Sequence, residues 1–126
     1  MQNPIPRPHD HIGTGRAGEF LAASKIEAAG LETSHTNASC DLHVTLPSGR
    51  VLRVEVKTSS KISKYGSYRF HRGGSNAEVF VFVSLPLSLI RIFDVAEIEG
   101  KKTITIQPTD FTQQAEDEDI AGLFLH

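Results

Sequence analysis

The chain has 126 residues and a formal net charge of −2 at pH 7, with 39 % hydrophobic and 22 % charged residues. These values predict one globular domain with a single core and argue against a disordered or fibrous chain. The longest apolar run, VFVFV at 79–83, is far shorter than the roughly 20 residues that span a bilayer, and the N-terminal stretch lacks the apolar region of a secretory signal. Cys40 is the only cysteine, which excludes an internal disulfide, so we expect a cytoplasmic protein.

The small net charge hides a strong asymmetry along the chain. Residues 56–77 contain five basic and no acidic residues, whereas residues 107–126 contain five acidic residues and no Lys or Arg. The basic segment is typical of a nucleic-acid contact, although a solvated basic loop has the same composition. For the acidic segment, a solvated helix face is the simpler interpretation.

The chain opens with a proline-rich stretch, so we expect residues 1–12 to form a flexible arm and residues 13–126 to form a single domain. A helix is predicted to start at the N-cap Thr14 and to stop at Gly30. One stripe at helical spacing is expected to face the core: Ala17, Phe20, Leu21, Ser24, Ala28 and Leu31.

The remainder reads mainly as β-structure. Strands are predicted over 41–46, 51–57, 65–71, 77–85, 89–95 and 102–107. A short C-terminal helix is expected after Thr109. The order of helix, then strands, then helix predicts an α+β domain built around one mixed sheet.

The first two strands are joined by a Pro-Ser-Gly turn and predict a β-hairpin. Its apolar residues must share the core face: Leu42, Val44, Leu46, Leu52, Val54 and Val56. A three-residue loop would oppose Asp41 to Lys57, and a five-residue loop would oppose Asp41 to Glu55. Either register makes Asp41, Glu55 and Lys57 direct or diagonal neighbours on the polar face, with Cβ atoms roughly 5–8 Å apart. Two carboxylates beside an ammonium group suit a hard divalent cation such as Mg²⁺.

The triplet Glu55-x-Lys57 is weak evidence alone, because an acid-x-Lys triplet is expected about 0.7 times by chance in this composition. A second copy, Glu99-x-Lys101, occurs in a glycine turn with no acid at hairpin distance upstream. The copy at Glu55 therefore stands out by its hairpin geometry.

With these residues in place, the chain resembles the PD-(D/E)xK nuclease superfamily, the restriction-endonuclease-like phosphodiesterases. The resemblance covers about residues 13–85 and rests on a helical Glu19 in GRAGEF, on Asp41 opening a strand, and on Glu55-x-Lys57 followed by TSS. The layout is most similar to archaeal-type Holliday junction resolvases and small homing endonucleases. It implies an α/β/α-like core in which the N-terminal helix packs on a mixed sheet containing the hairpin.

The resemblance also implies roles for individual residues. Asp41 and Glu55 would hold Mg²⁺, with Mn²⁺ as a substitute, together with the main-chain carbonyl of Val56. Lys57 would orient or deprotonate the attacking water, and Glu19 would support the metal shell.

Two features depart from the family pattern. Cys40 replaces the proline that names the motif, at a position that is not a ligand. Helical periodicity puts Glu19 almost opposite the predicted core stripe, beside Ala22, Ala23 and Ile26. Glu19 would therefore reach the site only if this Ala/Ile face packed on the sheet; otherwise it is an exposed first-turn Glu favoured by the helix dipole.

The basic segment that follows the hairpin is expected to grip DNA phosphates through four residues: Lys61, Lys64, Arg69 and Arg72. Tyr68 and Phe70 alternate with Arg69 and are expected to face the core. Because one active site cuts one strand, cleavage of both strands predicts a homodimer or larger homo-oligomer.

The leading hypothesis is thus a Mg²⁺-dependent DNA endonuclease, structure-selective or site-specific. One alternative is a catalytically silent DNA-binding or assembly subunit with the same fold. Another is an α+β interaction module that uses its acidic C-terminal segment.

Overall fold

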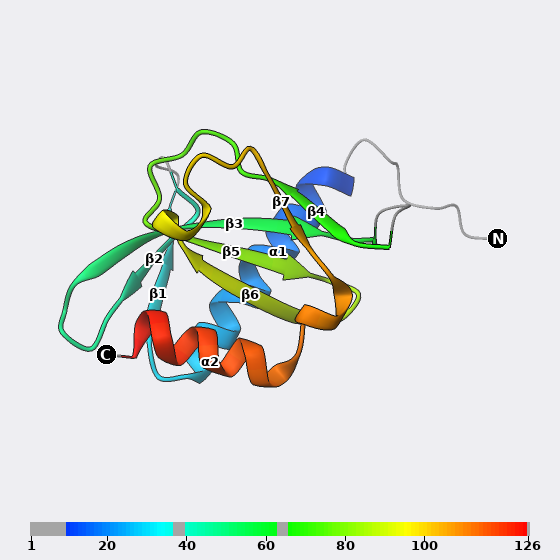
Figure 1. The fold of residues 1–126 in the computed structure, drawn as a ribbon. Helices are drawn as coiled ribbons and strands as arrows, with labels where there is room; N and C mark the ends of the chain where they lie inside the picture. The colour runs from blue at the N-terminus through cyan, green and yellow to red at the C-terminus, as the bar shows by residue number, and fades with distance from the viewer. Residues whose placement is uncertain (1–9, 37–39, 63–65, 126) are drawn as a thin grey trace.

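The computed structural model describes residues 10–36, 40–62 and 66–125 (Figure 1). The elements in chain order are α1 (Asp10–Ala28), β1 (Glu32–His35), β2 (Leu42–Thr45), β3 (Val51–Ser59), β4 (Tyr68–His71), β5 (Val79–Ser84), β6 (Leu89–Asp94), the 3₁₀ helix η2 (Val95–Ile98), β7 (Thr103–Ile106), the 3₁₀ helix η3 (Pro108–Asp110) and α2 (Gln113–Phe124). No described helix is both long enough and apolar enough to cross a membrane.

Five strands form the central sheet in the order β1-β2-β3-β5-β6. β3 and β5 run parallel, whereas the other neighbours pair antiparallel, so the sheet is mixed. β4 and β7 form a separate antiparallel ribbon, which crosses in front of the sheet in Figure 1 while α1 lies behind it. The predicted α+β class, with the N-terminal helix packed on a mixed sheet, is confirmed.

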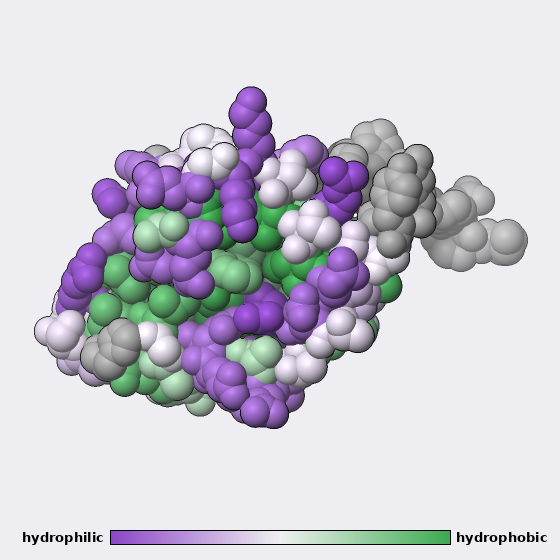
Figure 2. All heavy atoms as spheres, in the orientation of Figure 1, coloured by the Kyte–Doolittle hydropathy of each residue, from purple (hydrophilic) through white to green (hydrophobic). Residues whose placement is uncertain are grey.

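The two faces of the sheet carry two cores. On one face, residues of α1 and α2 pack on alternate strand residues such as Val54, Val56 and Val81. On the other face, the β4–β7 ribbon covers Phe80 and Phe82. The second outer layer is therefore a β-ribbon, where an α/β/α-like arrangement would have a helix. Figure 2 shows polar side chains over much of the viewed face, with apolar surface between them in its left half.

The ribbon is anchored by its aromatic residues. Tyr68 and Phe70 are buried and Arg69 is exposed, as the alternation predicted. The Ser84 hydroxyl of β5 donates to the buried Tyr68 hydroxyl at 2.7 Å, so the central sheet and the ribbon share a polar contact inside the core. This contact satisfies two hydroxyls that water does not reach.

Three predictions about local structure need correction. The stripe assigned to the core is only partly right: Leu31 is buried and Leu21 packs against the core, but Phe20 is 55 % exposed and α1 mainly buries Ala22, Ala23 and Ile26. The helix begins at Asp10 and not after Thr14, so the predicted arm over 1–12 overlaps it, and residues 1–9 lie outside the described residues. Strand β1 was not predicted, because three of its four residues are exposed and it lacks apolar alternation.

Candidate functional site

The hairpin between β2 and β3 has the register of the five-residue loop. Leu42 pairs with Val54 and His43 pairs with Arg53, which brings Asp41 opposite Glu55. The turn closes through Gly49, whose φ of +91° lies in the left-handed region that glycine adopts without strain. Asp41 and Glu55 are therefore neighbours on the polar face, as predicted.

Asp41 lies just before β2 and is held against β3 by two hydrogen bonds. Its backbone N–H donates to the Val54 carbonyl at 3.0 Å, and its Oδ2 accepts from the Val56 N–H at 2.8 Å. In a strand, the N–H and the C=O of one residue point to the same side, so the Val56 carbonyl is also directed toward Asp41. Asp41 and the Val56 carbonyl thus offer oxygen atoms on the same side of β3.

Glu55 and Lys57 are side by side on β3, facing the β4–β7 layer. Lys57 Nζ lies 3.4 Å from Glu55 Oε2, with 29 % and 15 % of the two side chains exposed. Burial raises the pKa of Glu55, the Asp41 charge raises it further, and Lys57 works in the opposite direction. Burial and the Asp41 charge together thus outweigh the effect of Lys57 on the pKa of Glu55.

Glu19 reaches this region because α1 packs close to β3. Gly18 makes that approach possible, since a Cβ at this position would collide with the Thr58 side chain. Burial raises the pKa of Glu19, and the Asp41 charge adds to the shift. Glu19 Oε1 also lies 3.6 Å from His35 Nδ1 on β1. The small-residue face of α1 is thus the one that contacts the sheet, and it brings Glu19 within electrostatic range of Asp41.

A divalent cation fits the chemistry of these side chains. Within the described ranges, no three acidic, histidine or cysteine side chains converge as a metal site. Asp41, Glu55 and Glu19 nevertheless supply the carboxylate oxygens that Mg²⁺ prefers, and burial, with added repulsion from Asp41, raises the pKa of Glu55 and of Glu19. A bound cation would relieve that repulsion, so the Mg²⁺ site stays a prediction with physical support.

Two residues that the sequence did not single out contact the same centre. The Ser75 hydroxyl makes a hydrogen bond to Glu55 that favours the charged carboxylate. Gly73 has a φ of +69°, and a Cβ there would lie 3.3 Å from Lys57 Nζ. The only sequence signal was the RGGSN composition at 72–76, which indicates a turn without saying what it covers.

The predicted DNA-contacting residues lie in different environments. Arg69 is exposed on the outer face of β4 and Lys61 is exposed after β3, whereas Lys64 lies outside the described residues. The Arg72 guanidinium stacks over the Phe80 ring, with Cζ 5.2 Å from the ring centroid. Its Nε is buried and has no hydrogen-bond partner among the described residues. Arg69 and Lys61 are thus available to a ligand, while Arg72 is partly enclosed.

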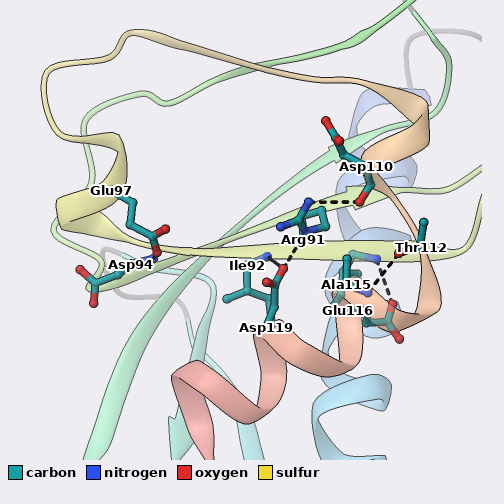
Figure 3. Close-up of polar contacts among 10 residues, drawn as sticks. Arg91, Ile92, Asp94, Glu97, Asp110, Thr112, Ala115, Glu116 and Asp119 are labelled. Carbon is teal, nitrogen blue, oxygen red and sulfur yellow. Dashed lines mark hydrogen bonds and ion pairs between the residues drawn. The ribbon is translucent and has the colours of Figure 1, made fainter.

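The acidic C-terminal segment is used inside the fold, in α2. Figure 3 shows Asp119 accepting from the Ile92 N–H at 2.9 Å and from Arg91 Nε at 2.7 Å. The buried Glu116 accepts from the Ile90 N–H and lies 3.0 Å from Lys25 Nζ of α1. These two carboxylates cover the free edge of β6, whereas Asp110, Asp117 and Glu118 are exposed, so an interaction module that uses the acidic segment stays a prediction.

The mixed sheet with α1 and α2 on one face and the β4–β7 ribbon on the other defines an α+β domain, whose fold can be compared with solved structures. Among solved structures, the chain is similar to a bacterial homing endonuclease, I-Ssp6803I. The two structures superpose with a TM-score of 0.68 and 25 % sequence identity over 79 % of this chain and 77 % of that chain. Neither a family model nor a curated protein sequence matches the chain. The expected likeness to small homing endonucleases is confirmed for the fold, and membership of the PD-(D/E)xK superfamily stays a prediction.

Proposed function

We propose that this protein is a divalent-metal-dependent DNA endonuclease that hydrolyses phosphodiester bonds at the Asp41–Glu55–Lys57 centre. The observation that carries the proposal is that the Asp41 carboxylate accepts a hydrogen bond from the Val56 N–H, next to the Glu55–Lys57 pair. The similarity to a homing endonuclease supports the same activity. An acidic pair with an adjacent lysine has no evident structural need, because burying carboxylates near each other opposes folding.

Asp41, Glu55 and the Val56 carbonyl would hold Mg²⁺ or Mn²⁺, and Glu19 would support them from α1. When bound, such an ion supplies a Lewis acid for the phosphate and lowers the pKa of water. The chain's own contribution is to hold these oxygens in place, through the Asp41 hydrogen bond to β3 and the close packing of Gly18 on Thr58.

Lys57 is the residue proposed to orient or deprotonate the attacking water. Its ammonium group lies 3.4 Å from Glu55 Oε2, and its side chain is 29 % exposed, so Lys57 has both a fixed neighbour and access to solvent. From there it orients the water and opposes the negative charge that gathers on the phosphate in the transition state. A lysine at this position therefore accelerates cleavage more than it strengthens DNA binding.

DNA is the proposed partner, bound by Lys61, Arg69 and Arg72 and by Lys64, which lies outside the described residues. Exposed basic residues bind phosphates largely without regard to sequence and lose affinity as salt increases. Cutting both strands of a duplex, or two arms of a junction, requires two copies of the centre, so we propose a homodimer or larger assembly.

The test is a cleavage assay on supercoiled, linear and four-way-junction DNA with Mg²⁺, Mn²⁺ or EDTA. The wild type is expected to cut at least one substrate with either metal and none with EDTA, and Asp41→Ala is expected to leave it intact. DNA binding without cleavage by the wild type would instead identify a catalytically silent relative. Cleavage by Asp41→Ala at the wild-type rate would refute the proposed centre.

A further inference from the structure

A cavity of about 510 Å³ lies between α1 and the end of β1. It is lined by Arg16, Glu19, Phe20, His35 and Thr36. Glu19 belongs to this cavity and also feels the Asp41 charge of the centre. Whatever fills the cavity therefore lies against Glu19, the residue proposed to support the metal ligands.

Phe20 is the most unusual residue in this lining. Its side chain is 55 % exposed, the largest value among the exposed large hydrophobic residues of the described chain. The core face of α1 is formed by other residues, so Phe20 contributes little to the packing of the helix on the sheet. Its ring lies 4.9 Å from the His35 ring at an interplanar angle of 55°. The two rings leave aromatic surface facing the cavity and solvent.

The cavity combines these rings with a cation. Arg16 is exposed on α1, one helical turn before Phe20, and its charge opposes the rise in the pKa of Glu19 that burial causes. Aromatic faces next to a guanidinium group suit a flat heteroaromatic ring that is covalently linked to a phosphate. Within DNA, that combination is a nucleotide whose base has left the helical stack, because paired bases present no free face.

We propose that this cavity binds one unstacked nucleobase of the DNA, stacked on Phe20 with His35 beside it, and with Arg16 on a neighbouring phosphate. This inference rests on the proposed nuclease function and narrows its substrate to DNA with an unpaired base next to the cleaved bond. Branch points, bulges and melted duplexes supply such bases, whereas uninterrupted duplex does so only after local opening.

The experiment uses two matched duplexes, one fully paired and one with a single unpaired 2-aminopurine, in EDTA so that binding is measured without cleavage. Binding of the wild type should quench the fluorescence of the unpaired 2-aminopurine. Phe20→Ala should abolish the quench and bind the unpaired duplex about tenfold more weakly, with unchanged affinity for the paired duplex. Phe20→Tyr should retain the quench.

Leu87→Ala is the control for loss of an exposed apolar side chain, because Leu87 is 40 % exposed and does not line the cavity. An equal quench with Phe20→Ala and wild type would overturn the inference while leaving the nuclease proposal intact. A changed oligomeric state in Phe20→Ala, with the quench retained, would assign the surface to a protein contact and also overturn it. Failure of the wild type to bind either duplex would overturn both proposals.

Discussion

Asp41, which precedes β2, accepts a hydrogen bond through its carboxylate from the Val56 N–H of β3, at 2.8 Å. The bond fixes the carboxylate at the edge of the hairpin and directs its charge toward Glu55, whose pKa it helps to raise. Both carboxylates therefore remain close together without an opposing charge of equal strength. This arrangement opposes folding unless a ligand compensates it, and that conflict motivates the first prediction.

Glu55→Gln should stabilise the metal-free protein at neutral pH. Because burial and Asp41 raise the pKa of Glu55 above its usual 4.5, the carboxyl favours folding most when it is protonated. Its contribution is full below pH 4.5 and is lost as the pH rises through the raised value. Urea unfolding in EDTA from pH 4 to 8 should show that the free energy of unfolding of Glu55→Gln increases relative to that of the wild type as the pH rises. Glu99→Gln, which replaces an exposed acid of the second triplet, should not gain stability relative to the wild type.

Gly73→Ala and Gly100→Ala are a matched pair of variants that tests whether Gly73 positions Lys57. Both glycines have positive φ, +69° and +80°, so either alanine should cost about 1 kcal/mol of stability. Only the Gly73 substitution places a carbon 3.3 Å from Lys57 Nζ, whereas Gly100 faces open space. We expect cleavage to slow only in Gly73→Ala. If the two variants have equal unfolding midpoints and also cleave DNA at equal rates, Gly73 has no role in placing Lys57.

Gly18→Ala should destabilise the protein by about 1–3 kcal/mol, because the new methyl group collides with Thr58. The collision forces α1 away from β3 and with it the neighbouring Glu19. Thr58→Ala, which removes part of the obstructing side chain, should recover some of the loss in a double variant, as measured by urea unfolding. If the two substitutions were strictly additive, the helix and the strand would not be in the contact described.

Glu116→Gln should cost about 3 kcal/mol, because it leaves the Lys25 ammonium between α1 and α2 without its opposite charge. Glu118 lies on the same helix, is exposed and makes its one described contact with Gln114. Glu118→Gln should therefore change the free energy of unfolding by less than about 0.5 kcal/mol. A similar loss in both variants would mean that the Lys25–Glu116 pair is not what joins the helices.

The sequence predicted the hairpin well because two local signals agreed. Apolar residues alternate on both flanks, and a Pro-Ser-Gly turn separates them. The register stayed open between two loops because a shift of two residues keeps the same residues on the core face. Only the paired strands show that Asp41 opposes Glu55.

The face of α1 could not be predicted because residue hydrophobicity pointed to Phe20 and Leu21. The helix instead buries small residues, starting at Gly18, since these allow its backbone to approach β3. The two strands of the β4–β7 ribbon were predicted, but their pairing was not, because they are distant in the chain. The position of Ser75 and Gly73 over the Glu55–Lys57 pair follows from that ribbon and had no local signal.

The central claim is that Glu55 belongs to a catalytic centre, and single-turnover cleavage by Glu55→Gln and Glu99→Gln tests it most directly. The two acids precede lysines in identical acid-x-Lys triplets, but only Glu55 lies beside Asp41. In Mg²⁺ with saturating protein, Glu55→Gln should lose at least about 10²-fold in rate, and Glu99→Gln should match the wild type. Equal rates for Glu55→Gln and wild type would contradict the account.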